Sequence, residues 1–159
     1  MSLPSFVSLR ALALLIVANS TPVVLSRMLG GHFAGPIDGG LRLPDGTEVL
    51  GAHKTWRGMA GGAIAAGALG TLLGWGFITS AGFGALALVG DLLSSFLKRR
   101  FGCGAGRSMP LLDQLPEALL PMLVLRGRIG LTTASIVGTA AVFTALALAA
   151  AWVSTRNRT

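Results

Sequence analysis

The chain has 159 residues, of which 52% are hydrophobic, only 12% are charged and 23 are glycines. Soluble domains carry about 25% charged residues and about 7% glycine, so this composition argues against a soluble enzyme and favours lipid-facing helices packed through small residues. The mean hydropathy of +0.71 argues against a disordered chain. The single cysteine, Cys103, excludes an internal disulfide and a multi-cysteine metal site.

Five apolar stretches approach the roughly 20 residues that a helix needs to cross a bilayer. The first continues beyond Pro22, which favours a proline-kinked span over the alternative of a cleavable signal peptide. The fourth is short and holds two prolines, which predicts a tight or partly re-entrant span. We therefore predict an all-α membrane protein, one domain over residues 1–159, with spans at about 6–29, 59–78, 82–97, 114–125 and 129–153.

The positions of lysine and arginine predict the orientation. The net charge of +7 rests on 13 Lys and Arg residues, and three of them, Arg10, Arg126 and Arg128, fall on one side of the predicted bundle. The other side then holds the remaining ten, which by the positive-inside rule makes it cytoplasmic. This places the N-terminus outside, puts 30–58, 98–113 and the C-terminal tail in the cytoplasm, and predicts a multi-pass protein of the inner or plasma membrane. The ten are Arg27, Arg42, Lys54, Arg57, Lys98, Arg99, Arg100, Arg107, Arg156 and Arg158.

Small residues recur at every fourth position of the second span, which predicts close helix packing on one face. This stripe comprises Gly58, Gly62, Ala66, Gly70 and Gly74.

The acidic residues gather in or beside the two predicted cytoplasmic loops. In the first loop, glycines beside a carboxylate allow close backbone approach to a ligand, and Lys54 and Arg57 can bind phosphate oxygens. Trp56 can stack on a base or anchor at the membrane interface, and both readings remain open. The six acids are Asp38, Asp45, Glu48, Asp91, Asp113 and Glu117.

A polar stripe marks the end of the third span. Asp91, Ser94, Ser95 and Lys98 fall at positions i, i+3, i+4 and i+7, so they share one helix face. An intramembrane carboxylate is costly and is a functional-site candidate by default. The alternative for Asp91 is a structural ion pair with a neighbouring arginine.

Carboxylates, Lys, Arg, hydroxyls and glycines at a membrane surface suit phosphoryl or nucleotidyl transfer. An attacking phosphate is already ionised, and magnesium held through one or two carboxylates supplies electrostatic stabilisation. We interpret His32, His53 and Cys103 as spectators. A nucleic-acid partner is not expected.

Three motifs in this order resemble the CDP-archaeol synthase family, integral-membrane cytidylyltransferases related to phosphatidate cytidylyltransferase. The first is Lys54-Thr55-Trp56-Arg57-Gly58 and the second runs from Gly90-Asp91 to Lys98-Arg99-Arg100. The third is Asp113-Gln114-Leu115. The resemblance covers most of the chain, including the five spans and both loops.

The resemblance implies that CTP and an isoprenoid ether-lipid phosphate, or a phosphatidate-like lipid, react to a CDP-lipid and pyrophosphate with Mg²⁺. CTP, the lipid phosphate and membrane lipids are the implied partners, and a homo-oligomer stays open. Catalysis is implied for Asp91, Lys98 and Asp113, and metal binding for Asp91 and Asp113. Substrate binding is implied for Asp38, Lys54, Thr55, Arg57, Ser95 and Arg99.

One departure from the family pattern follows the third motif. The family usually reads Asp-Gln-Leu-Asp, whereas here Pro116 and then Glu117 follow Leu115. If a helix starts there, Pro116 fits its first turn and Glu117 shares a face with Asp113. Glu117 is therefore the candidate replacement as a third metal ligand.

Two other functions remain as alternatives. One is a transport or ion-conducting subunit with Asp91 in a polar pathway, although the second and fifth spans hold no polar residues beyond Thr and Ser. The other is a non-catalytic relative that acts as a membrane assembly partner, suggested only by Pro116.

Overall fold

The computed structural model describes residues 3–101 and 109–156, and within them it contains helices but no strand. Two isolated β-bridges lie in the segment between the first two helices. The helices are α1 (Leu3–Leu29), α2 (Trp56–Leu72), α3 (Phe77–Arg100), α4 (Pro110–Val124), α5 (Arg126–Ile129) and α6 (Thr133–Arg156).

The predicted boundary between the second and third spans is wrong. Helix α2 ends at Leu72 rather than Ile78, and α3 begins at Phe77, five residues before the predicted start. The reason is local: Gly74 and Gly76 adopt φ angles of +81° and +72°, which side chains rarely tolerate and which interrupt a helix. Apolar composition alone does not register this turn, because its residues are as hydrophobic as the helices they join.

The predicted start of the fourth span is also wrong. Helix α4 begins at Pro110, so Pro116 and Pro121 both lie inside it and neither sits in the first turn. Each proline lacks the N–H that would bond to the carbonyl four residues earlier. The last span begins at Thr133 rather than residue 129, because the short helix α5 precedes it.

Helix α3 lies at the centre of the bundle and packs against α1, α2 and α4, while α6 packs against α1 and α4. Four residues of the predicted small-residue stripe, Gly58, Gly62, Ala66 and Gly70, are buried on α2, whereas Gly74 lies beyond the end of the helix in the turn before α3. A side chain at Gly62 would collide with the carbonyl of Ala18 on α1, and one at Gly70 would collide with Ser80 on α3. The core is apolar and includes Leu14, Leu15, Phe83 and Met122, all fully buried.

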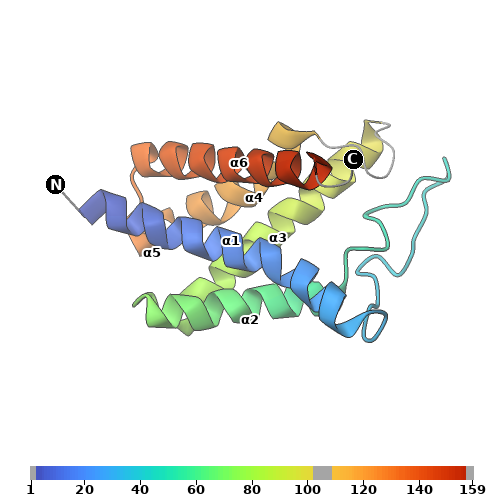
Figure 1. The fold of residues 1–159 in the computed structure, drawn as a ribbon, viewed down its shortest axis with the longest axis horizontal. Coiled ribbons are helices and arrows are strands. Elements are labelled where there is room, and N and C mark those ends of the chain that lie inside the picture. The colour runs from blue at the N-terminus through green and yellow to red at the C-terminus, as the bar shows by residue number, and fades with distance from the viewer. Residues whose placement is uncertain (1–2, 102–108, 157–159) are drawn as a thin grey trace.

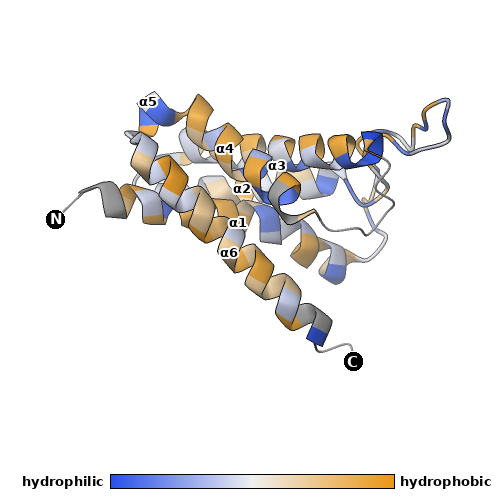
Figure 2. Cartoon of the chain, turned by 90° about the horizontal axis from the view of Figure 1, so that it is seen from above, coloured by the Kyte–Doolittle hydropathy of each residue, from blue (hydrophilic) through white to orange (hydrophobic). Residues whose placement is uncertain are grey.

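Polar segments gather at the two ends of the bundle. The segment between α1 and α2, the C-terminal end of α3, the start of α4 and the end of α6 lie at one end, and the N-terminus and α5 lie at the other (Figure 1). Apolar residues dominate the helices between these ends (Figure 2). Among the described residues, Phe6–Leu29, Phe77–Arg100 and Thr133–Val153 are long and apolar enough to cross a membrane.

Candidate active site

The segment from 30 to 55, here called the polar loop, is closed at its base by backbone pairing. The N–H of Ile37 donates to the carbonyl of Lys54 at 2.8 Å, and the N–H of Trp56 donates to that of Gly35 at 3.1 Å. This pairing fixes the backbone of Lys54 at the start of α2. Trp56 is 61% exposed, as both of its predicted roles require.

Asp38 organises the interior of the polar loop. Its carboxylate accepts hydrogen bonds from the N–H groups of Gly40 at 3.0 Å, Leu50 at 2.9 Å and Gly51 at 3.3 Å. Desolvation alone would raise the pKa of Asp38, but these backbone donors together lower it below its ordinary value. The observed role of Asp38 is therefore to hold loop backbone.

Thr55 and Arg57 also make structural contacts. The hydroxyl of Thr55 caps α2 by accepting from the N–H of Gly58 at 3.2 Å. The guanidinium of Arg57 donates to the carbonyl of Gly30 at 3.1 Å and to that of His32. Arg57 thus fastens the end of α1 to the start of α2, rather than extending freely towards a ligand.

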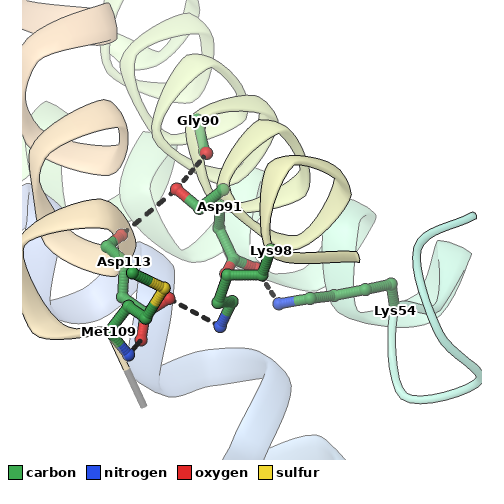
Figure 3. A network of polar contacts seen from close by, with 7 residues as sticks. Lys54, Gly90, Asp91, Lys98, Met109 and Asp113 are labelled. Atoms are coloured by element: carbon green, nitrogen blue, oxygen red, sulfur yellow. Dashed lines mark hydrogen bonds and ion pairs between the residues drawn. The ribbon is translucent and has the colours of Figure 1, made fainter. Parts of the chain in front are cut away.

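Lys54 and Asp91 form an ion pair between the polar loop and α3 (Figure 3). The predicted alternative of a structural pair with an arginine is therefore wrong about the partner, because Asp91 faces a lysine. Both side chains are largely buried, with exposed fractions of 15% and 25%. A pair this sheltered from water is less screened than a surface pair.

Lys98 and Asp113 form a second pair, between α3 and α4 (Figure 3). Lys98 Nζ lies 2.5 Å from Asp113 Oδ1. The two groups do not meet the angles of a hydrogen bond, so the contact is an ion pair. The other oxygen of Asp113 accepts from the N–H of Met109 at 3.2 Å. Ser94 on α3 reaches the Asp113 carbonyl at 3.4 Å, which joins the two helices again.

Glu117 is the most buried acidic side chain of the site, with 7% exposed. Its carboxyl group lies near that of Asp91, and both residues line the same cavity. The helices touch here because Gly90 lacks a side chain: a Cβ at Gly90 would collide with the carbonyl of Pro116. Glu117 thus reaches the same site as Asp91 from the interior of α4.

A cavity of about 890 Å³ adjoins the Lys54–Asp91 pair. Its polar side also includes His53, whose pKa is lowered by desolvation and by the charge of Lys54. Its remaining walls are largely apolar and come mainly from α1 and α6, with further residues from the polar loop, α2, α3 and α4. The α1 residues are Ile16, Asn19, Ser20, Pro22, Val23, Ser26 and Arg27, and the α6 residues are Phe143, Leu146, Ala147 and Ala150.

The described residues contain no group of three or more His, Cys, Asp or Glu side chains arranged to hold a metal ion. Asp91 and Glu117 nevertheless bring two carboxyl groups together at the cavity wall. Magnesium is commonly bound through one or two carboxylates plus substrate phosphates. The donor set therefore fits a magnesium ion that shares its coordination with a phosphate ligand.

The ten predicted site residues divide into three groups. The cavity wall includes Lys54, Thr55, Asp91 and Glu117, and the Lys98–Asp113 pair lies on the same two helices as Asp91 and Glu117. The cavity wall does not include Asp38, Arg57, Ser95 or Arg99.

Sequence reasoning gave no site role to Asn19, Arg27, His53 or Gln114, although Gln114 lies in the third motif, yet all four line the cavity. For Arg27 a signal existed, because it is the basic residue in the last turn of the first span, at the polar-loop end. Cys103, Arg107 and Arg158, which the sequence analysis names, lie outside the described residues.

The profile of the CarS-like CDP-archaeol synthase family matches residues 75–156. The CDP-archaeol synthase of Hyperthermus butylicus is 39% identical, with a match covering 68% of this chain and 65% of the relative. Those of Aeropyrum pernix and Thermococcus gammatolerans are 42% and 41% identical, covering 63% and 62% of this chain. The chain spans 58–65% of the length of these three relatives.

A solved structure of an intramembrane enzyme for archaeal membrane lipid biosynthesis has a similar fold. Its TM-score is 0.75 at 36% identity, and the match covers 89% of this chain and 90% of that one. Together with the three long apolar helices, this similarity makes the chain an all-helical membrane protein. The family profile, which spans more than half of the chain and includes Asp91, Lys98, Asp113 and Glu117, shows that the chain belongs to the CDP-archaeol synthase family.

Proposed function

We propose that the chain is a membrane cytidylyltransferase that transfers the CMP group of CTP to a lipid phosphate and releases pyrophosphate. The observation that carries the proposal is the position of Asp91, which contacts Lys54 and Glu117 beside a cavity with apolar walls. Such a site offers ionic groups to phosphates and a hydrocarbon surface to lipid tails. The names of the curated relatives support the same reaction.

In the proposed reaction an oxygen of the lipid phosphate attacks the α-phosphorus of CTP. A new P–O bond forms as the bond to the oxygen bridging the α- and β-phosphates breaks, and pyrophosphate leaves with that electron pair. The lipid phosphate is already ionised, so positioning and charge stabilisation replace a general base. Lys54 binds and orients phosphate oxygens at the cavity, and Lys98 does so from the next turns of α3.

Magnesium fits the carboxyl groups of Asp91 and Glu117, and when bound it neutralises the developing phosphate charge. Asp113 is the other predicted metal ligand. To bind the same ion as Asp91 and Glu117, its carboxylate has to give up its contacts with Lys98 and Met109. Asp38, Thr55 and Arg57 contribute to substrate binding by holding the polar loop against α2 and α3. This role replaces the direct phosphate contact that the sequence predicts for Arg57.

We further propose that α2 and the shorter α4 are membrane-embedded together with α1, α3 and α6, with the polar loop in the cytoplasm and the N-terminus outside. The common position of the polar loop and the end of α3 at one end of the bundle supports this orientation (Figure 1). Cysteines introduced at residues 45 and 105, with Cys103 replaced by serine, should both react from the cytoplasmic side of sealed vesicles. Labelling from opposite sides would contradict the orientation.

The experiment incubates purified protein with radiolabelled CTP, magnesium and a panel of dialkylglycerol and diacylglycerol phosphates. We expect the label to enter the lipid fraction, and we expect EDTA, which removes the metal, to abolish this incorporation. ATP, GTP and UTP run in parallel give the nucleotide preference. Absence of lipid labelling with every panel member would overturn the proposed function.

A further inference from the structure

The basic side chains around the site differ in whether the protein already neutralises them. Most have a protein partner, whereas Arg27 and Arg99 make no hydrogen bond or ion pair with the described residues. A cation without a protein partner is available to an anionic ligand. The partnered groups are Arg42 with Glu48, Lys54 with Asp91, Arg57 with two carbonyls, Lys98 with Asp113, and Arg100 with Asp45.

Arg27 is in the last turn of α1, and it lines the cavity. Val23, one turn earlier, and Ile16, further along the same helix, belong to the apolar wall of that cavity. A lipid lying along α1 and α6 with its polar end at the polar-loop side of the bundle therefore brings its phosphate level with Arg27. Neither the family motifs nor the predicted site includes this residue.

Arg99 is on a different side of the site. Its guanidinium lies beside Gly51 of the polar loop, where an added Cβ would come within 3.1 Å of it. It is eight residues beyond Asp91 on α3 and does not line the cavity. The two unpartnered arginines therefore approach the site from two elements, one from the apolar-walled cavity and one from the polar loop.

We propose that Arg27 binds the phosphate group of the lipid substrate, and that the triphosphate of the nucleotide lies on the Arg99 side. The inference rests on the proposed function and assigns its two anionic substrates to two different cations. The ligand of Arg27 is a phosphate monoester carried by hydrocarbon chains. The guanidinium is suited to it because two parallel N–H groups match two phosphate oxygens.

Charge balance explains why a cation is needed at Arg27. Asp91 and Glu117 both line the cavity, and before a metal ion is bound the negative charge there repels a phosphate dianion that enters along α1. The charge of Lys54 is already shared with Asp91. Arg27 is the basic residue on the α1 wall of the cavity, so it offsets the negative charge of a lipid phosphate bound there.

The test compares Michaelis constants of wild type, Arg27→Gln and Arg27→Lys for CTP and for a short-chain dialkylglycerol phosphate in detergent micelles. Losing a hydrogen bond to a charged group should raise the KM for the lipid phosphate in Arg27→Gln roughly 10- to 100-fold, with the KM for CTP unchanged. Arg27→Lys keeps the charge but loses the bidentate contact, so its KM for the lipid phosphate should lie between those of wild type and Arg27→Gln. Arg99→Gln should show the opposite pattern.

The matched control is Arg42→Gln, because Arg42 is an exposed arginine of the polar loop outside the cavity. If the KM for CTP rises instead, or both constants rise equally, Arg27 binds the nucleotide or acts through general charge, and the inference is wrong. Unchanged constants with a slightly lower melting temperature would leave Arg27 as a complement to the α1 dipole, which also overturns it. If Arg27→Gln is inactive, Arg27→Lys makes the same comparison. An inactive wild type would instead contradict the proposed function.

Discussion

The α3–α4 contact and the polar loop supply the site in different ways. The α3–α4 half contains Asp91, Lys98 and Asp113 at fixed helical positions. The two helices pack closely at Gly90 because this residue has no side chain. In the polar loop, Lys54 depends on a chain of backbone hydrogen bonds that Asp38 and Arg57 maintain. The helical half is therefore set by packing, and the loop half by polar contacts that water can replace.

The largest expected effect comes from the helical half. Asp91→Asn keeps the shape of the side chain but removes its charge, which leaves Lys54 without its counter-ion and weakens metal binding. Because losing even an indirect partner of a metal ion typically costs about 10- to 100-fold, losing a direct carboxylate ligand should lower CDP-lipid formation at least about 100-fold. Turnover in detergent, with gel filtration to verify folding, measures it. Asp45→Asn, at the exposed tip of the polar loop, is the control, and substantial activity in Asp91→Asn would show that Asp91 is not a metal ligand.

Glu117→Gln tests whether the interior of α4 supplies a metal ligand. If Glu117 holds magnesium with Asp91, the apparent magnesium affinity should fall about 10- to 100-fold while the KM for the lipid changes little. Glu117 does not lie in the first turn of α4, which begins at Pro110, so a role as a complement to the helix dipole is excluded. Titrating activity against magnesium makes the measurement. Superimposable curves for wild type and variant would mean that the site works without Glu117.

Gly90→Ala tests the packing of the helical half. The added methyl group would collide with the Pro116 carbonyl, so α3 and α4 must separate at a typical overpacking cost of about 1–3 kcal/mol. Thermal unfolding in detergent should show a lower melting temperature. Gly82→Ala on the same helix meets nothing within 4 Å and is the matched control. Equal melting temperatures in the two variants would contradict the close contact.

Asp38→Ala should have the smallest effect, confined to the loop half. Three backbone N–H groups lose their acceptor. Because the loop is largely exposed, water can accept some of these hydrogen bonds instead. We expect about a two- to tenfold higher KM for CTP, faster proteolysis of the loop and an unchanged melting temperature. Glu48→Ala removes only the exposed pair with Arg42 and should do none of this. A melting temperature that falls as far as in Gly90→Ala would show that the two halves are not separable.

The helical part of the fold was predictable because apolar stretches and small-residue spacing report helices and their contact faces. Gly62 and Gly70 belong to the stripe of small residues at every fourth position, and this spacing predicts that they face neighbouring helices. The ends of the helices were not predictable in the same way. The turn at residues 73–76 depends on two glycine φ angles, and α4 begins with a proline at its first position, a signal that the length of an apolar stretch does not include.

The candidate site was predictable to a similar, limited degree. Helical periodicity placed Asp91, Ser94, Ser95 and Lys98 on one face, and the structure brings Asp91 and Lys98 into ion pairs. Periodicity does not report which partner a charge meets across the bundle, so the pairing with Lys54 was missed. Residues assigned to substrate because they are basic or acidic, such as Arg57 and Asp38, turned out to bond to backbone.

The most direct test of nucleotidyl transfer follows two labels of the same nucleotide. Purified protein, magnesium and a dialkylglycerol phosphate are incubated in parallel with CTP labelled at the α-phosphate or at the γ-phosphate. Attack on the α-phosphorus predicts that the α-label enters the lipid fraction, while the γ-label stays in water as pyrophosphate. Transfer of the γ-label to the lipid would indicate a kinase, and transfer of neither label would contradict the account.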